Sequence, residues 1–165
     1  MSEHDLHRYI QANFAILIVS DTRDEKTDES GRIAKNLVGD QGHQVVAYQI
    51  LRNDKALVQR RVKELIQNPD INVILTSGGT GISTRDVTVE AVSPLFTKSI
   101  EGFGELFRQL SYQEIEEAAM ISRATAGTAK GNLIFCLPGS KKAVKLALSK
   151  LILPGLGHAI QEANR

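Results

Sequence analysis

Several features are scarce in this sequence, and each scarcity excludes a class of protein. The chain holds one cysteine, Cys136, and no tryptophan. A single cysteine can form neither an internal disulfide nor a cysteine cluster for zinc. The longest unbroken apolar run covers residues 14–19, whereas a membrane-spanning helix needs about 20 apolar residues. We therefore expect no membrane association.

Charge of one sign is scarce as well. The sequence has 20 lysine and arginine residues against 19 aspartate and glutamate residues, for a formal charge of +1. Without a strong field, bulk attraction to nucleic acid or to an anionic membrane is not expected. The first eleven residues are polar and do not fit a secretory signal peptide. We expect a cytoplasmic protein.

What is present fits one globular domain. The 165 residues are 42% hydrophobic and 24% charged, and a chain of this length buries about two-thirds of its unfolded surface. No internal repeat or linker interrupts it. We expect a single domain over residues 1–165, with a short N-terminal extension of residues 1–13.

Short apolar runs alternate with helical patterns along the chain. The runs at residues 14–19, 45–50, 73–76 and 133–137 predict buried strands. Apolar residues at helical spacing predict helices near residues 33–38, 58–66, 103–110 and 144–152, with Ser30 as N-cap of the first and Pro154-Gly155 closing the last. This alternation predicts an α/β fold, a mostly parallel sheet with helices on both faces.

One stretch departs from the alternation. Residues 124–129 and 132–137 are separated by Lys130-Gly131, a two-residue connection typical of a β-hairpin. The sequence therefore predicts one antiparallel hairpin strand, which makes the sheet mixed.

The most informative segment follows the third predicted strand. We call Ser77, Gly78, Gly79, Thr80 and Gly81 the glycine loop. Successive backbone N–H groups in such a loop can bind phosphate, and the two hydroxyls add donors. A tight turn without a ligand is the alternative. The segment lacks the lysine of a P-loop and the G-x-G-x-x-G spacing of a dinucleotide site.

Asp86 follows closely and has two interpretations. It could cap the helix predicted at residues 87–95. It could instead hold Mg²⁺ beside a bound phosphate, with Arg85 neutralising phosphate charge.

A second turn, Pro138, Gly139 and Ser140, follows the last strand, and we call it the proline turn. Ser140 is the predicted N-cap of the next helix, which opens with Lys141 and Lys142. Cations there oppose the helix dipole unless an anion binds nearby. The alternative is two exposed lysines.

The candidate segments share one geometric property. Ser20 and Asp21, the glycine loop and the proline turn each come directly after a predicted strand. In an open parallel sheet these strand ends lie along one edge, where ligands bind. The sequence therefore predicts one crevice that contains all three segments.

Four blocks of residues carry a family resemblance: residues 76–81, 85–88, 102–105 and 137–140. In order and spacing they resemble the MoaB/MogA molybdopterin-binding family of molybdenum cofactor biosynthesis proteins. The residues before Phe14 and the stretch 100–108 favour its MoaB branch. The resemblance covers about residues 14–152.

The resemblance implies a three-layer α/β/α sandwich that binds molybdopterin, a phosphorylated dithiolene pterin. Active members adenylylate this pterin with ATP and Mg²⁺. The glycine loop would bind phosphate, Asp86 would hold the metal, and Ser20, Asp21 and the proline turn would contact substrate. The family also implies a homotrimer or a homohexamer built as a dimer of trimers.

One position departs from the family pattern. Adenylylating members have a second aspartate before the second helix, and Asn53 occupies that position here, with Asp54 one residue on. Asn53 is a neutral, weaker ligand for Mg²⁺, and Asp54 could serve as the catalytic ligand instead. Three hypotheses follow: an adenylyltransferase, a non-catalytic pterin-binding or assembly protein, and an unrelated nucleotide-phosphate binder.

Overall fold

The structure, a computed structural model, describes residues 8–165; residues 1–7 of the expected extension lie outside the described residues. A six-stranded sheet has the order β2-β1-β3-β6-β5-β4. The strands are β1 (Asn13–Val19), β2 (Gln44–Leu51), β3 (Val73–Ser77), β4 (Lys98–Ser99), β5 (Thr125–Ala129) and β6 (Asn132–Leu137). Four of them, β2, β1, β3 and β6, pair in parallel, while β5 and β4 pair antiparallel. The mostly parallel mixed sheet is confirmed.

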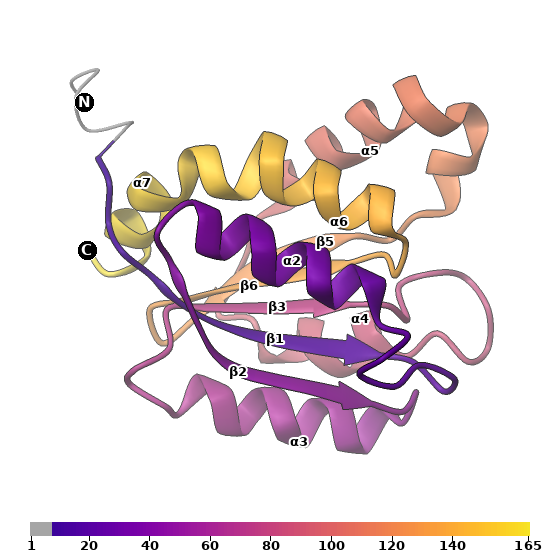
Figure 1. The fold of residues 1–165 in the computed structure, drawn as a ribbon, viewed down its shortest axis with the longest axis horizontal. Coiled ribbons are helices and arrows are strands. Elements are labelled where there is room, and N and C mark those ends of the chain that lie inside the picture. The colour runs from indigo at the N-terminus through magenta and orange to yellow at the C-terminus, as the bar shows by residue number, and fades with distance from the viewer. Residues whose placement is uncertain (1–7) are drawn as a thin grey trace.

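Helices form the outer two layers (Figure 1). They are α2 (Glu29–Asp40), α3 (Lys55–Ile66), α4 (Thr88–Val92), α5 (Glu101–Ile115), α6 (Lys141–Ala147) and α7 (Leu153–Ala163), with short helical turns η1 (Ser93–Leu95), η2 (Glu116–Ile121) and η3 (Leu148–Ile152). The core on one face includes residues of α2, α5, α6 and α7, and the core on the other includes residues of α3 and α4. The predicted three-layer sandwich is confirmed.

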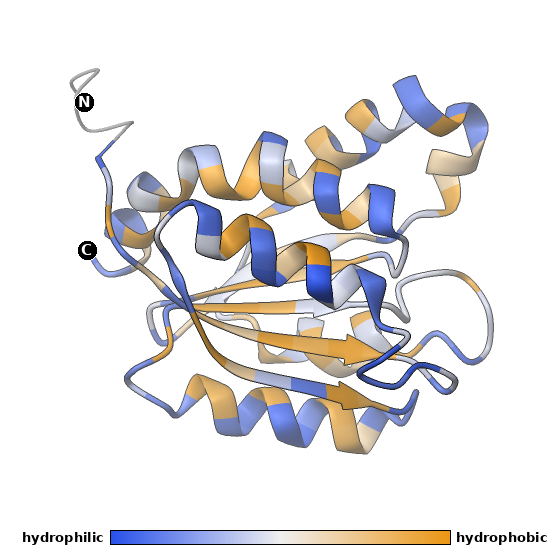
Figure 2. Cartoon of the chain, in the orientation of Figure 1, coloured by the Kyte–Doolittle hydropathy of each residue, from blue (hydrophilic) through white to orange (hydrophobic). Residues whose placement is uncertain are grey.

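Strand β1 shows why both faces need cover. Phe14 and Ile16 belong to one core, Ala15 and Leu17 to the other, and all four are fully buried. Successive side chains of a strand point to opposite faces, so an unbroken apolar run predicts a strand covered on both sides. Figure 2 shows the hydrophobic colour of β1 between amphipathic helices.

The hairpin forms as the sequence predicts. Lys130 and Gly131 have φ values of 50° and 80°, the left-handed region that two-residue hairpin turns require. No sequence pattern indicates β4, because its two residues, Lys98 and Ser99, are exposed and polar. Such a short edge strand is held by pairing with β5.

Two helix boundaries differ from the sequence prediction, and the first is the start of α2. Its N-cap is Asp28, whose carboxylate accepts a hydrogen bond from Gly31 N at 2.9 Å. Ser30 is inside the helix, and its hydroxyl donates to the carbonyl of Gly139 at 2.7 Å. A carboxylate and a hydroxyl both cap well, so the tertiary contact of Ser30 decides between them.

The second difference is the end of the last helix, which does not stop at Pro154. The helical segment continues to Ala163 through the π-turn η3. A proline lacks an N–H and its ring crowds the carbonyl four residues earlier, and a π-turn just before it shifts the hydrogen-bond pattern. Burial of Leu156 and Ile160 in the core favours the continuation.

The helical segment Lys141–Ala163 contains an 18-residue stretch that is apolar enough, by length and composition alone, to cross a bilayer. In the structure it lies against the sheet. Val144, Leu148 and Ile152 on its inner side are buried in the core. The segment is therefore a core helix of the sandwich.

Candidate functional site

The predicted crevice forms at the carboxyl ends of the parallel strands. The last residue of β3, Ser77, pairs with Ile18 on one side and with Leu137 on the other. Along the chain, β1 leads through α2 to β2, and β2 leads through α3 back past β1 to β3. The strand order therefore reverses between β1 and β3, the point at which open α/β sheets bind ligands. The structure confirms that the segments after β1, β3 and β6 share this edge.

The glycine loop is held tightly at this edge. Gly78 and Gly79 have φ values of 103° and 72°, and a Cβ on Gly78 would overlap the carbonyl oxygen of Val19. Thr88, fully buried at the start of α4, donates from its hydroxyl to Gly78 O at 2.7 Å and from its amide to Gly79 O at 3.0 Å. Ser77 donates its hydroxyl proton to Pro138 O at 3.1 Å, which joins the glycine loop to the proline turn.

Asp86 lies beside the glycine loop and does not cap α4. The N-cap of α4 is Val87, whereas the Asp86 carboxylate accepts from Ser83 N at 2.9 Å. One of its oxygens lies 2.6 Å from the position that a Cβ on Gly81 would take. The helix-cap interpretation is therefore wrong, and the carboxylate is placed against the candidate phosphate loop.

The proline turn is fixed from two directions. Ser140 is the N-cap of α6, as predicted, and its hydroxyl accepts from Ala143 N at 3.2 Å. Lys141 forms an ion pair with Glu29 at 2.7 Å, which lowers the pKa of Glu29. Lys142 is turned to the crevice, where it is one of the lining residues.

A cavity of about 300 Å³ opens between these segments and the helical layer. Its polar side is formed by residues 79–81 of the glycine loop, Asp86, the proline turn and Lys142. Its apolar wall comes from α5, η2 and α6 and includes Phe107, Ile115, Ile121 and Leu146. The sequence does not indicate this wall, because helical periodicity predicts an apolar face without showing which part of the protein that face contacts.

Asp86 also faces a second hollow, of about 450 Å³, on the other side of its loop. Charged side chains line that hollow: Lys55, Glu90 and Arg123. Arg123 forms an ion pair with Glu90, and its Nε donates to Gly81 O at 2.9 Å. Arg123 thus anchors the glycine loop from outside, and nothing in the local sequence indicates that role. Asp86 therefore lines both the 300 Å³ cavity and this hollow.

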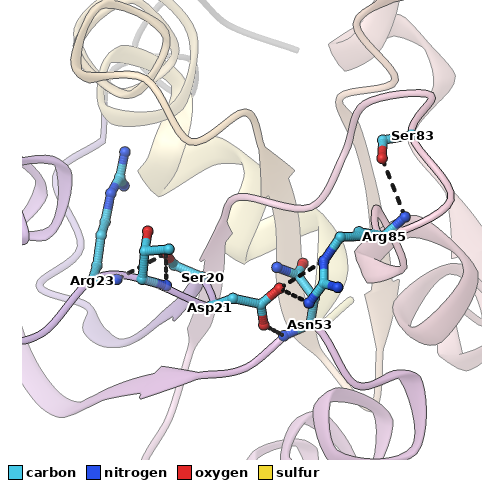
Figure 3. Close-up of polar contacts among 7 residues, drawn as sticks. Ser20, Asp21, Arg23, Asn53, Ser83 and Arg85 are labelled. Carbon is cyan, nitrogen blue, oxygen red and sulfur yellow. Dashed lines mark hydrogen bonds and ion pairs between the residues drawn. The ribbon is translucent and has the colours of Figure 1, made fainter.

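Asp21 has its carboxylate occupied within the protein. It accepts from the Asn53 amide at 3.0 Å and forms an ion pair with Arg85, whose Nε donates at 3.0 Å (Figure 3). These contacts lower the pKa of Asp21 to about 2, with the Arg85 hydrogen bond as the largest cause. Arg85, expected to neutralise phosphate, is thus paired with a carboxylate. The neighbouring Ser20 hydroxyl accepts from the amide of Arg23 at 3.2 Å.

Asn53 and Asp54 lie in different surroundings. The Asn53 side-chain oxygen is buried and has no hydrogen-bond partner among residues 8–165; it lies 3.1 Å from the position that a Cβ on Gly79 would take. Asp54 is the N-cap of α3 and accepts from Leu57 N at 2.9 Å. Asp86 lines the 300 Å³ cavity, whereas neither Asn53 nor Asp54 is among its lining residues.

The donor set suits a magnesium ion that arrives with a nucleotide. Within the described chain, no three His, Cys, Asp or Glu side chains cluster as a metal site. Mg²⁺ at phosphate-transfer sites takes only one or two carboxylates and completes its shell with phosphate oxygens and water. The Asp86 carboxylate and the unpartnered oxygen of Asn53, both beside the glycine loop, fit that requirement.

Comparison with known protein families shows to which family this chain belongs. The family described as "Probable molybdopterin binding domain" matches residues 15–158. This chain belongs to the MoaB/MogA molybdopterin-binding family. The match includes the glycine loop, Asp86 and the proline turn.

Relatives of full length support the assignment. Molybdenum cofactor biosynthesis protein B of Bacillus cereus is 46% identical over 166 residues, covering 100% of this chain and 98% of the relative. The protein of the same name from Staphylococcus aureus is 49% identical over 171 residues, with 100% of both chains covered.

Solved structures agree with the fold. A crystal structure of a molybdenum cofactor biosynthesis protein B has a TM-score of 0.91 at 48% identity, covering 94% of this chain and 98% of that chain. The tungsten cofactor synthesizing protein MoaB from Pyrococcus furiosus has a TM-score of 0.85 at 35% identity, covering 96% of this chain and 100% of that chain.

Proposed function

We propose that this protein acts in molybdenum cofactor biosynthesis, where it binds molybdopterin and adenylylates it with ATP and Mg²⁺. The names of its relatives and its membership of the family support the pathway. One observation supports the chemical step: the Asp86 carboxylate lies beside the glycine loop, and Asp86 lines both the 300 Å³ cavity and the hollow that contains Lys55, Glu90 and Arg123. ATP-dependent chemistry also fits the cytoplasmic location expected from the sequence.

The cavity combines an apolar wall with polar groups, and this combination suits a phosphorylated pterin. Its wall from α5, η2 and α6 offers apolar surface to a flat ring, while the glycine loop and Ser140 offer polar groups to a phosphate. Lys142 adds a positive charge at the same place. Ligand sites commonly combine such an apolar wall with a few fixed polar groups.

The proposed reaction joins two anions. An oxygen of the pterin's terminal phosphate forms a bond to the α-phosphorus of ATP, and the bond from that phosphorus to the bridging oxygen breaks. Pyrophosphate leaves with the electron pair. Such a transfer depends mainly on alignment and on neutralising charge.

The residues of this chain supply the alignment. The glycine loop would bind phosphate with backbone N–H groups, and Thr88 and Arg123 keep its shape by binding its carbonyls. Asp86 and Asn53 would hold the Mg²⁺ ion, which supplies positive charge against the phosphate oxygens when bound. Asp54 remains the alternative to Asn53; its Oδ1 caps α3 by accepting from the amide of Leu57.

The test is adenylyl transfer by purified protein supplied with molybdopterin, ATP and Mg²⁺. We expect Asp86→Asn to lower the rate by about 100-fold or more, because it removes the charge that faces both hollows. Asp40→Asn is the matched control, since Asp40 is exposed at the far end of α2. Wild-type protein that forms no adenylylated pterin would refute the enzyme, and failure to bind molybdopterin would refute the binding function as well.

Asn53 favours a second candidate, a pterin-binding or assembly protein without catalysis. A neutral amide holds Mg²⁺ less strongly than a carboxylate. Calorimetry that detects molybdopterin binding unaffected by ATP, together with no turnover, would support this candidate. In the enzyme, Asn53→Asp should raise the transfer rate at low Mg²⁺ concentration; in a binding protein it should change nothing.

We also propose that the protein assembles as a homotrimer or a dimer of trimers, as its family resemblance implies. Five large hydrophobic side chains of the described chain are exposed on α5 and η2, two of which, Ile115 and Ile121, also line the cavity; the other three are Leu106, Tyr112 and Met120. This part of the chain stands away from the sheet in Figure 1. Light scattering coupled to size-exclusion chromatography should give a molecular mass of three or six times 18.1 kDa. The substitution Met120→Glu should reduce that mass.

A further inference from the structure

Three segments of the crevice edge meet on one carboxylate, that of Asp21. Its Oδ1 accepts from the amide of Asn53 at 3.0 Å, and its Oδ2 pairs with the guanidinium of Arg85. Asp21 follows β1, Asn53 follows β2, and Arg85 belongs to the segment after β3 (Figure 3). Both oxygens of Asp21 are therefore engaged inside the protein, which leaves this side chain poorly suited to be a metal or substrate ligand.

The segment 82–86 depends on this contact for its position. Its own bonds are local: Asp86 N to Ser83 O at 3.0 Å, Ser83 N to the Asp86 carboxylate at 2.9 Å, and Arg85 N to Ser83 Oγ at 3.3 Å. In the part of the chain that the structure describes, the pairing with Asp21 is the hydrogen-bonded link from this segment to another segment. Asp86 is the next residue after Arg85, so the link also limits where the Asp86 carboxylate can lie.

Asn53 is held by the same carboxylate. Its backbone amide is fixed by Asp21, while its side-chain oxygen is buried near Gly79 with no partner from residues 8–165. Fixing the backbone of Asn53 therefore keeps that oxygen directed at the glycine loop. The two candidate metal-holding groups, Asp86 and Asn53, come from different segments and share Asp21 as their common anchor.

We propose that Asp21 is a positioning residue that sets the separation of Asp86 and Asn53 across the crevice, acting through Arg85 and through the Asn53 amide. The catalytic part of this inference rests on the proposed adenylyl transfer. Arg85, with a side chain 71% exposed, serves in the free protein as the tether of its loop. Exposed ion pairs add little to global stability, so the consequence is local geometry rather than folding.

The first test needs no ligand. Hydrogen exchange of the amides of residues 53 and 82–86 is compared in wild type, Asp21→Asn, Arg85→Gln and the charge-matched control Asp40→Asn. We expect exchange to become up to about fivefold faster in the first two variants, the range that an exposed ion pair can supply, with unchanged melting temperatures. Unchanged exchange in both variants would overturn the proposal, whether or not the protein is an enzyme.

The second test concerns catalysis. Asp21→Asn and Arg85→Gln should each lower kcat for adenylyl transfer by about tenfold or more, as misplacement of aligned groups does, with little change in KM for ATP. The double variant should lose no more than Asp21→Asn alone, because that substitution already weakens the pairing that Arg85→Gln removes. Losses that multiply, or a loss confined to KM in Arg85→Gln, would show that Arg85 binds substrate directly and would overturn the positioning role. A wild type without transfer activity refutes the proposed function, while hydrogen exchange still decides on the tether.

Discussion

Replacing Gly78 by alanine tests the part of the site that depends most on backbone geometry. The φ of 103° at Gly78 costs an L-residue about 1–2 kcal/mol. The new Cβ would also overlap the carbonyl oxygen of Val19, well inside the 3.0 Å that Cβ atoms keep from other atoms. That oxygen belongs to β1 in the core of the sheet, so it cannot move aside cheaply, and such overpacking adds about 1–3 kcal/mol.

We therefore expect Gly78→Ala to lose about 2–5 kcal/mol of unfolding free energy. For a chain of this size each kcal/mol corresponds to about 2–4 °C, so the melting temperature should fall by about 5–20 °C. The assay is thermal unfolding followed by circular dichroism at one protein concentration. The affinity of the Gly78→Ala variant for molybdopterin should also fall, since the shape of the glycine loop depends on Gly78.

Gly102→Ala is the matched control. No described atom lies within 4 Å of a Cβ at Gly102, which is in the first turn of α5. Alanine favours a helix over glycine by up to about 1 kcal/mol, so this variant should melt at the wild-type temperature or slightly above. A Gly78→Ala protein that melts within about 2 °C of wild type would refute the argument from φ and from the Val19 carbonyl.

Three further predictions concern groups outside the 300 Å³ cavity. Tyr48 donates to the carboxylate of Asp28, which is 2% exposed; Tyr48→Phe leaves that oxygen without its donor and should lower the urea-derived stability by about 1–3 kcal/mol. Burial raises the pKa of the Cys136 thiol to about 12, so the native protein should not react with a thiol reagent at about pH 8, whereas the denatured protein should react fully. Arg123 lowers the pKa of Glu90 from its ordinary 4.5. A carboxyl group whose pKa is lowered in the folded state stabilises the fold at pH values above its unfolded-state pKa, and this stabilisation is lost as the pH falls. Urea midpoints should thus fall more steeply for wild type than for Glu90→Gln below about pH 4.5; parallel curves would contradict the pairing.

Local patterns in the sequence were sufficient for most of the sheet. The run at residues 14–19 predicts β1 because only a strand covered on both faces buries every side chain of such a run. Lys130-Gly131 predicts the hairpin because a two-residue turn needs residues that accept positive φ. The location of the crevice followed from topology, since parallel strands separated by helices end on the same edge.

Other features depended on competition that no local pattern records. Pro154 reads as a helix stop, yet burial of the residues beyond it outweighs the local penalty. Ser30 reads as an N-cap, yet it donates to Gly139, 109 residues away, while Asp28 takes the cap. In both cases a contact between residues distant in sequence outweighs a local preference worth about 1–3 kcal/mol.

The sequence by itself determined every strand but β4, most of the helix boundaries, the family and the segments that meet at the crevice. Only the tertiary structure decided which contacts each side chain makes there: Asp86 lines the cavity instead of capping α4, and Asp21 pairs with Arg85, 64 residues away. The physical reason is the range of the forces concerned. Strands, turns and helices follow from neighbours along the chain, whereas the partner of a charged group follows from folding that brings distant residues within 3 Å or so.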